Sequence, residues 1–111
     1  MDGNFVALIG RSKALNSKVF SLVRLQLLAS LAAFEPDGVT YRELKASLGL
    51  SDGALFSNLK ALQMTGYVKR EEVKFEGKNL DLFKLTPEGN AEWEAAAEWL
   101  REFLDFGGSK T

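Results

Sequence analysis

Apolar residues recur with a helical period over the first third of this 111-residue chain. In residues 5–20 they lie at roughly helical spacing with polar residues between them, which predicts a short amphipathic helix. Ser21 is placed to cap a second helix over residues 22–34, and the segment "EPDG" at 35–38 ends it. The apolar residues of this second helix share one face, which we expect to lie in the core: Leu22, Leu25, Leu28, Ala29 and Ala32.

The next segment has signals for two short helices joined by a tight turn. Thr40 and Glu43 form a T-x-x-E capping box, and Gly49 is placed to end that helix in a left-handed conformation. Ser51 follows almost at once and can cap the next helix, so the two helices must cross at a steep angle. The buried stripe of this next helix is Leu55, Leu59 and Leu62. The pattern predicts a helix-turn-helix.

From Tyr67 the apolar and polar positions alternate with a period of two, which predicts a strand. The segment "EGKN" at 76–79 has the composition of a turn, and "LDLFKLT" returns as a second strand. Residues 67–86 are therefore expected to form a β-hairpin.

The last helix is predicted to begin at Pro87, with Thr86 as its cap, and to run to Phe106. The final segment at 107–111, "GGSKT", is expected to be a flexible tail. The fold class is therefore mainly α with a small β-hairpin, and the length suits a single domain over residues 1–106.

The composition excludes several classes of chemistry. The chain has no cysteine and no histidine, which removes disulfides, thiol nucleophiles, imidazole bases and almost every zinc or copper site. No carboxylates fall in a recognisable acid and base arrangement, so we expect no catalytic residues, no metal site, no cofactor and no enzymatic activity. No run of 18 or more apolar residues appears, and the N-terminus is acidic. These features predict a soluble, cytoplasmic protein with no membrane partner.

The formal net charge is -1, but the charge is unevenly distributed. Residues 1–84 carry twelve Lys and Arg against nine Asp and Glu, whereas residues 85–111 carry two against six. A mildly basic body thus precedes an acidic final segment.

The order of elements, with the segments "SLVRLQLL", "SDGALFSNLKALQMTGYV" and "FKLTPEG", resembles the winged helix-turn-helix domain of MarR-like and ArsR-like prokaryotic transcriptional regulators. It is most similar to small one-domain regulators of archaea and bacteria. The resemblance runs from about Ser21 to Leu104. It implies a winged helix-turn-helix core at 21–86 with dimerisation helices at 5–20 and 87–106. It also implies a homodimer that binds double-stranded DNA sequence-specifically.

The resemblance also implies where DNA would bind. The helix over 52–64 would enter the major groove, and the hairpin would contact the backbone or the minor groove. Turning 100° per residue away from the leucine stripe places Gly53, Ser57 and Lys60 outward. The candidate DNA contacts are Tyr41, Arg42, Ser51, Gly53, Ala54, Phe56, Ser57, Asn58, Lys60, Lys74, Lys78 and Asn79. Against this, Phe56 could pad the side of the domain, Asn58 could be a boundary residue, and the lysines could be solvated charges.

The terminal helices carry more apolar surface than a small winged core has to cover. In the resembling family such helices form a two-fold dimer interface, which implies a role for Phe5, Leu8, Ile9, Trp93, Trp99, Leu100 and Phe103. The alternative is that they only close the core of the monomer. A cavity between them and the DNA-binding body would be lined by Trp and Phe, and is a candidate site for an unknown small-molecule effector.

A second functional hypothesis is a winged-helix module that binds another protein and not DNA. The near-neutral charge and Phe56 on the recognition helix favour it, as does the hairpin tip "GKNLD" where related wings often carry arginines. Salt-sensitive binding of duplex DNA would distinguish the first hypothesis from the second.

Overall fold

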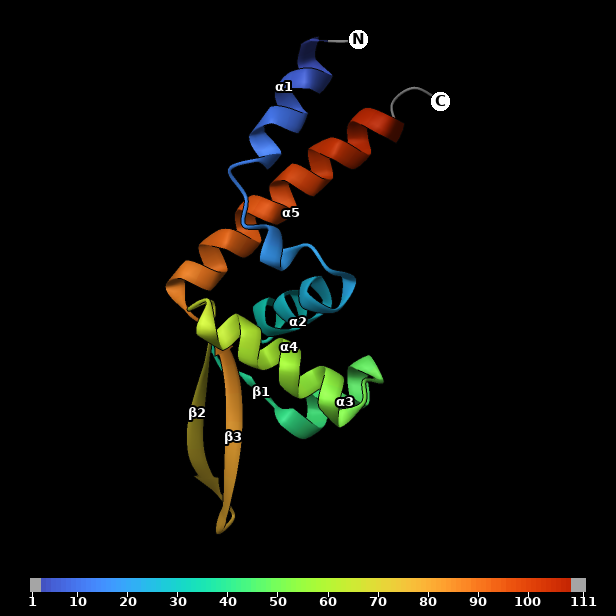
Figure 1. The fold of residues 1–111 in the computed structure, drawn as a ribbon. Coiled ribbons are helices and arrows are strands. Elements are labelled where there is room, and N and C mark those ends of the chain that lie inside the picture. The colour runs from blue at the N-terminus through green and yellow to red at the C-terminus, as the bar shows by residue number, and fades with distance from the viewer. Residues whose placement is uncertain (1–2, 109–111) are drawn as a thin grey trace.

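The computed structural model describes residues 3–108 and contains, over that range, five α-helices, one short 3-10 helix and three strands (Figure 1). Their bounds are α1 Gly3–Ser12, η1 Ser17–Val19, α2 Leu22–Ala33, β1 Val39–Thr40, α3 Tyr41–Leu48, α4 Asp52–Met64, β2 Val68–Phe75, β3 Lys78–Leu85 and α5 Pro87–Gly108. This arrangement confirms the predicted fold class, mainly α with a β-hairpin. None of the described helices is long and apolar enough to cross a membrane.

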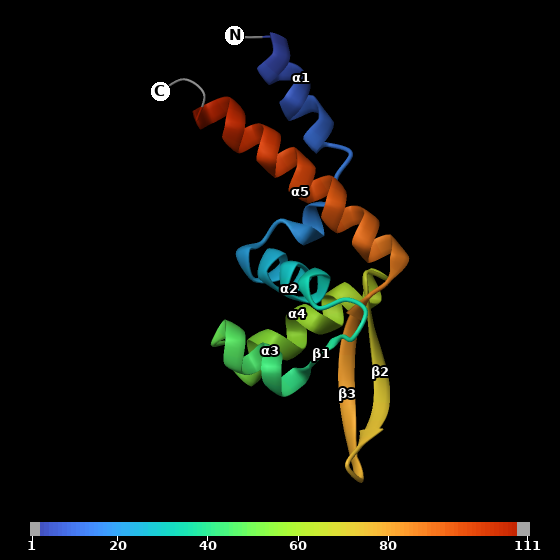
Figure 2. The ribbon, with the colours of Figure 1, turned by 180° about the vertical axis from the view of Figure 1, so that it is seen from behind.

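The molecule is elongated, with principal extents of 60 × 25 × 24 Å. Helices α2, α3 and α4 form the middle of the molecule, and the β2–β3 hairpin projects from them at one end (Figure 1). At the other end α1 lies beside the second half of α5, as the view from behind also shows (Figure 2). We call this pair of helices the α1–α5 arm.

The hydrophobic core lies where the middle helices meet the base of the hairpin. Leucines of α2, α3 and α4 pack there against apolar residues of β2, β3 and α5, and all of these residues are buried. The core is formed by Val19, Leu27, Leu28, Leu31, Val39, Leu44, Leu55, Leu59, Leu62, Val68, Phe83, Leu85 and Ala96. The leucine stripe predicted for α4 is therefore confirmed.

The predicted face of α2 is wrong at its first residue. Leu22 is 73% exposed, whereas Leu27 and Leu31, which the periodicity did not select, are fully buried. The reason is that α2 is covered on more than one side, by α4, α5 and the sheet, so its apolar positions do not follow a single stripe.

The first predicted helix, over residues 5–20, is interrupted. Helix α1 ends at Ser12, a run of turns follows, and η1 then carries Val19 into the core. The backbone N–H of Asn16 donates to Glu92 Oε1 of α5 at 2.6 Å, and its side-chain amide donates to the Tyr67 hydroxyl at 3.0 Å. These bonds to distant parts of the chain fix the break.

The C-terminal bound also differs from the prediction. Helix α5 continues through Gly107 and Gly108, so the first two residues of the predicted tail are helical. The rest of that tail, 109–111, lies outside the described residues.

A third strand and a shorter turn correct the predicted hairpin. Strand β1 pairs with β3, Val39 opposite Phe83, giving the antiparallel order β1-β3-β2. Two residues are too short to show a period of two, so the sequence pattern could not reveal β1. The turn consists of Glu76 and Gly77 alone, with φ of 51° and 77°. A two-residue turn with both residues left-handed is a type I′ turn. Since the turn ends at Gly77, Lys78 and Asn79 belong to β3 and not to the turn.

Candidate nucleic-acid interface

The tight turn between α3 and α4 is built by local capping interactions. Thr40 and Glu43 form the predicted capping box at the start of α3, and Gly49 ends that helix with φ of 63°. The Ser51 hydroxyl accepts from the backbone N–H of Ala54 at 3.2 Å and so starts α4. These caps fix the two helices across a link of three residues, 49–51, and confirm the tight turn that the sequence predicted.

Helix α4 has one buried face and one exposed face. The side chains of Phe56, Ser57, Lys60 and Met64 are exposed, and Gly53 continues the same stripe toward the turn. Apart from its chain neighbours and the backbone of its own helix, nothing lies within 4 Å of the position that a Cβ on Gly53 would occupy, so a partner can approach the backbone closely there. We call these five residues the α4 stripe. The 100° geometry therefore placed Gly53, Ser57 and Lys60 correctly, while Ala54 is half-buried.

Phe56 does not pad the side of the domain. Its side chain is 61% exposed, and the ammonium of Lys60 lies 5.7 Å from the centre of its ring. A cation over an aromatic face is a weak attraction that orients both groups. The stripe thus presents an apolar ring and a cation side by side.

Asn58 lies at the edge of the stripe and is half-buried. Its amide donates to the Ala54 carbonyl at 2.7 Å, and its oxygen accepts from Arg24 Nε of α2 at 3.2 Å. Asn58 therefore ties α4 to α2, which matches the boundary role that the sequence left open for it.

The N-terminal end of α4 carries a carboxylate that the sequence analysis did not select. Asp52 pairs with Lys45 at 3.0 Å, and the Tyr41 hydroxyl donates to both its carboxylate and its backbone carbonyl, at 3.3 and 3.2 Å. The hydrogen bond and charge of Lys45 hold the pKa of Asp52 below its ordinary value. Partial burial, and then the adjacent Asp52 carboxylate, raises the pKa of Tyr41. Of the candidates near this turn, Arg42 and Ser51 are exposed.

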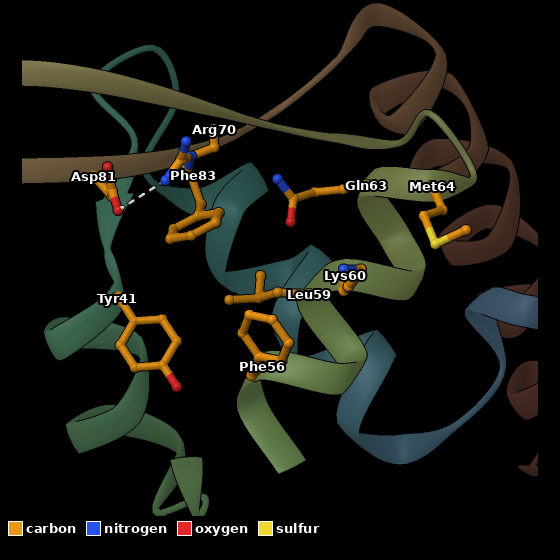
Figure 3. A pocket seen from close by; sticks show the side chains of 9 residues that line it. All are labelled: Tyr41, Phe56, Leu59, Lys60, Gln63, Met64, Arg70, Asp81 and Phe83. Atoms are coloured by element: carbon orange, nitrogen blue, oxygen red, sulfur yellow. Dashed lines mark hydrogen bonds and ion pairs between the residues drawn. The ribbon is translucent and has the colours of Figure 1, made fainter. Parts of the chain in front are cut away.

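A groove of about 600 Å³ lies between α4 and the hairpin (Figure 3). Phe56 and Lys60 face it from α4, Tyr41 faces it from α3, and Arg70 and Asp81 close its hairpin side. The remaining lining residues are Leu59, Gln63, Met64 and Phe83. We call it the α4–hairpin groove. Its lining is more apolar than polar, and its charged groups are those of Lys60, Arg70 and Asp81.

Arg70 is a groove residue that the sequence analysis missed. Its guanidinium donates to Asp81 Oδ2 at 3.3 Å across the hairpin. The period of two places Arg70 on the same face of β2 as buried Val68, so the face of the hairpin that carries Arg70 could be predicted from the sequence. The ion pair with Asp81 depends on the strand register and could not be predicted from the sequence.

The hairpin tip carries the other predicted DNA contacts. Lys74 lies directly opposite Asn79 in the β2–β3 ladder, and Lys78 lies opposite Phe75. All four side chains are exposed. Within residues 3–108 neither lysine forms an ion pair with a carboxylate. The tip therefore presents two available cations.

The α1–α5 arm is held together within the chain by residues that the sequence assigned to a dimer interface. Trp99 Nε1 donates to the Leu8 carbonyl at 2.7 Å, and the rings of Phe5 and Phe106 lie 5.1 Å apart. Leu8 is buried, and Trp93 packs against the core. Part of the expected interface thus closes the monomer, as the alternative hypothesis held.

Other apolar residues of the arm remain open. Leu104 is 68% exposed, and Val6 and Phe103 are also exposed. A shallow apolar hollow along α1 is lined by Phe5, Val6, Ile9, Gly10 and Lys13. The arm is therefore not fully covered by its own chain. Ile9 and Leu100 are half-buried.

A small cavity lies at the base of the α1–α5 arm. Arg11, Leu15, Ala95, Glu98 and Trp99 line it, and its volume is about 150 Å³. Ligand pockets usually measure about 300–1,000 Å³. An effector at this place stays a prediction.

Residues 23–104 match the family model of a winged helix DNA-binding domain. No match was found among curated proteins. A transcriptional regulator of the MarR family from Enterococcus faecalis V583 shares 22% identity, with a TM-score of 0.73 over 99% of this chain and 93% of that one.

Two further solved structures are similar. A transcriptional regulator homologue from Pyrococcus horikoshii OT3 shares 21% identity, with a TM-score of 0.72 over 81% of this chain and 87% of that one. MepR of S. aureus, solved in complex with DNA, shares 18% identity, with a TM-score of 0.71 over 96% of this chain and 88% of that one. These likenesses agree on the fold.

Proposed function

The chain belongs to the family of winged helix DNA-binding domains, and from this premise we propose that it is a homodimeric transcriptional regulator that reads double-stranded DNA. In this proposal α4 lies in the major groove and the hairpin contacts the backbone or the adjacent minor groove. No catalytic step is involved, because the protein acts by occupying its site.

The α4 stripe is the observation that supports this proposal most. A major groove about 12 Å wide admits one α-helix, provided that the helix presents a face that its own domain does not cover. The stripe is such a face, and the small residues Gly53 and Ser57 at its first turns allow close approach to base edges. The Ser57 hydroxyl can donate to or accept from a base or a phosphate, while Lys60 can donate to a phosphate or a guanine.

The exposed cations near the stripe also support DNA binding. Arg42 at the start of α3 and Lys74 and Lys78 at the hairpin tip are exposed, on the two elements that border the α4–hairpin groove with α4. A duplex lying along α4 would bring its phosphates toward both groups. Phosphate contacts release condensed counterions, so the proposal requires affinity that falls with salt.

The direct test begins with selection of bound duplexes from a random pool at about 50 mM salt, where phosphate contacts are strong. Fluorescence anisotropy then measures the affinity of a selected duplex as the salt is raised. Absence of binding to every duplex at the lowest salt would refute the proposal.

Lys60→Ala tests the placement of α4. We expect weaker binding and a salt dependence, log K against log salt, that is shallower by about 0.9 per protomer for one lost phosphate contact. The melting temperature should be unchanged because Lys60 is exposed. Lys13→Ala, which removes an equal charge at the base of the α1–α5 arm, is the control and should bind as the parent does.

The homodimer is proposed on the open apolar surface of the arm. Leu104, Phe103 and Val6 are exposed on two helices that project from the body, and a second copy could cover them by a two-fold axis. Such a dimer would set two α4 helices about 34–36 Å apart, one turn of DNA, and would read a pseudo-palindromic site. Half-site symmetry in the selected duplexes would support this arrangement.

Leu104→Glu tests the dimer. Burial of a carboxylate in an apolar interface is costly, so sedimentation should show a monomer, and affinity for a palindromic duplex should fall. Leu22→Glu alters another exposed leucine, outside the arm, and should leave the dimer intact. A parent protein that sediments as a monomer at all concentrations would contradict the assembly but not DNA binding.

The second candidate function, a protein-binding module, is favoured by one observation. Phe56 and Met64 are 61% and 80% exposed on the α4 stripe, which is apolar for a surface that contacts a polyanion. Salt-insensitive capture of a protein partner that Phe56→Ala abolishes, with no binding of duplex DNA, would support this candidate and exclude the first.

A further inference from the structure

Phe75 is a large apolar side chain at the free end of the hairpin. It is the last residue of β2, it is 61% exposed, and the turn at Glu76 follows it directly. The hairpin turn lies at the end of the molecule opposite α1 (Figures 1 and 2). A single exposed phenylalanine is common on protein surfaces. The turn and the charged residues around Phe75 indicate a specific role for this side chain.

The tip that carries Phe75 is narrow and well fixed. The β2–β3 ladder is continuous from Val68–Leu85 to Phe75–Lys78, and the type I′ turn closes it in two residues. Residues directly opposite in an antiparallel pair project to the same face, so Phe75 and Lys78 share one face. Lys74 and Asn79 share the other. An aromatic ring is thus held at a thin edge with hydrogen-bond donors on both sides.

The charges at the tip favour a polyanionic partner. Within residues 3–108, Lys74 and Lys78 form no ion pair, and Glu76 is the acidic residue of the turn. Two ammonium groups and an amide beside one ring match a groove walled by phosphates and floored by bases. A purely apolar protein pocket would have to desolvate both lysines.

The hairpin is long enough to extend from α4 to such a groove. It leaves the C-terminal end of α4, with β2 beginning four residues after Met64. Eight residues at about 3.3 Å each give a strand about 26 Å long. Adjacent major and minor grooves are separated by about half a turn, roughly 17 Å. With α4 in the major groove, the tip can therefore reach the neighbouring minor groove.

We propose that Phe75 is an apolar wedge that enters this minor groove and partly separates two stacked base pairs, while Lys74, Lys78 and Asn79 bind the flanking backbone and base edges. The inference rests on the proposed DNA binding and deepens it. Pyrimidine–purine steps unstack most easily, so the wedge selects such a step at a position that α4 does not read. Specificity at the wing then comes from the deformability of the duplex.

The test uses the full chain and a selected duplex in which 2-aminopurine replaces adenine at successive positions. This base fluoresces more strongly when it is unstacked. We expect the parent protein to increase the fluorescence at one step per half-site, outside the segment contacted by α4. Phe75→Ala should abolish the increase and bind about tenfold more weakly, as for the loss of one base–aromatic contact. Phe75→Leu should retain part of the increase, because leucine also serves as a wedge.

Phe34→Ala is the matched control, because Phe34 is 60% exposed and lies outside the hairpin. It should leave both fluorescence and affinity unchanged, and melting curves verify that each variant folds. If the parent protein binds DNA but increases the 2-aminopurine fluorescence at no position, the proposed wedge role of Phe75 is wrong, whereas the proposed DNA-binding function is not affected. Phe75→Ala that brightens the same step as the parent would overturn it too. Failure of the parent to bind any duplex would overturn both.

Discussion

Gly89→Ala is predicted to destabilise the fold strongly, because Gly89 lies against the backbone at the start of the hairpin. A Cβ at this position would lie 2.0 Å from the Tyr67 carbonyl oxygen and 2.8 Å from its carbon. Real Cβ contacts stay above 3.0 Å, so α5 and the segment entering β2 would have to separate by about 1 Å. Both partners are backbone, and no side chain can rotate away.

The junction at Gly89 is also tied by hydrogen bonds. Thr86 donates from its N–H to the Tyr67 carbonyl at 3.0 Å and from its hydroxyl to the Gly66 carbonyl at 2.6 Å. The N–H of Gly89 donates to the same hydroxyl at 2.9 Å. Overpacking costs about 1–3 kcal/mol, and a weakened hydrogen bond adds about 1 kcal/mol, so the expected loss is about 2–4 kcal/mol.

For a domain of this size, a loss of about 2–4 kcal/mol lowers the melting temperature by roughly 8–16 °C. Circular dichroism melts at one fixed protein concentration measure it, since dimerisation would make the midpoint concentration-dependent. Gly53→Ala is the control, because open space surrounds its Cβ position and its φ is not left-handed. The control should melt at or slightly above the parent temperature, as alanine favours a helix. A Gly89→Ala protein that melts with the parent would refute the packing argument.

Two further predictions concern ion pairs. Asp81→Asn should free the Arg70 guanidinium for a phosphate in the α4–hairpin groove, making the dependence of log K on log salt steeper by about 0.9 per protomer. The control, Asp105→Asn on the arm, should leave this dependence unchanged. An equal effect of both substitutions would mean that only net charge matters. The Lys84 hydrogen bond and charge lower the pKa of Glu71, so this pair stabilises the fold above the ordinary carboxyl value of 4.5 and loses its effect as the pH falls through the lowered pKa. Urea unfolding should therefore separate Glu71→Gln from the parent more at neutral pH than near pH 3, which lies below the ordinary value of 4.5; a constant difference at both pH values would contradict the pairing.

The helix-turn-helix could be predicted because its signals are local. The cap of α3 joins Thr40 to Glu43, and the cap of α4 joins Ser51 to Ala54, so each lies within one helical turn. The outward face of α4 followed from its leucine stripe by helical geometry alone. These features involve residues three or four positions apart, which the sequence shows directly.

The missed features depend on distant residues. The break after α1 is fixed by Asn16 through bonds to residues 76 and 51 positions away, and Trp99 bonds to the Leu8 carbonyl 91 positions away. The groove wall pairs Arg70 with Asp81 through a strand register. Such contacts are set by tertiary packing, for which a periodic pattern carries no signal.

The distribution of paired and available cations limits how far charge can contribute to DNA binding. Three of the ion pairs, Lys45–Asp52, Arg70–Asp81 and Lys84–Glu71, lie on the half of the molecule that carries α4 and the hairpin, and each neutralises a cation. The available exposed cations near the candidate contacts are Arg42, Lys60, Lys74 and Lys78. Four phosphate contacts per protomer correspond to a salt slope of about -3.6, and a dimer to about -7. The remaining affinity has to come from shape and apolar contact, which is where the exposed rings of Phe56 and Phe75 acquire their role.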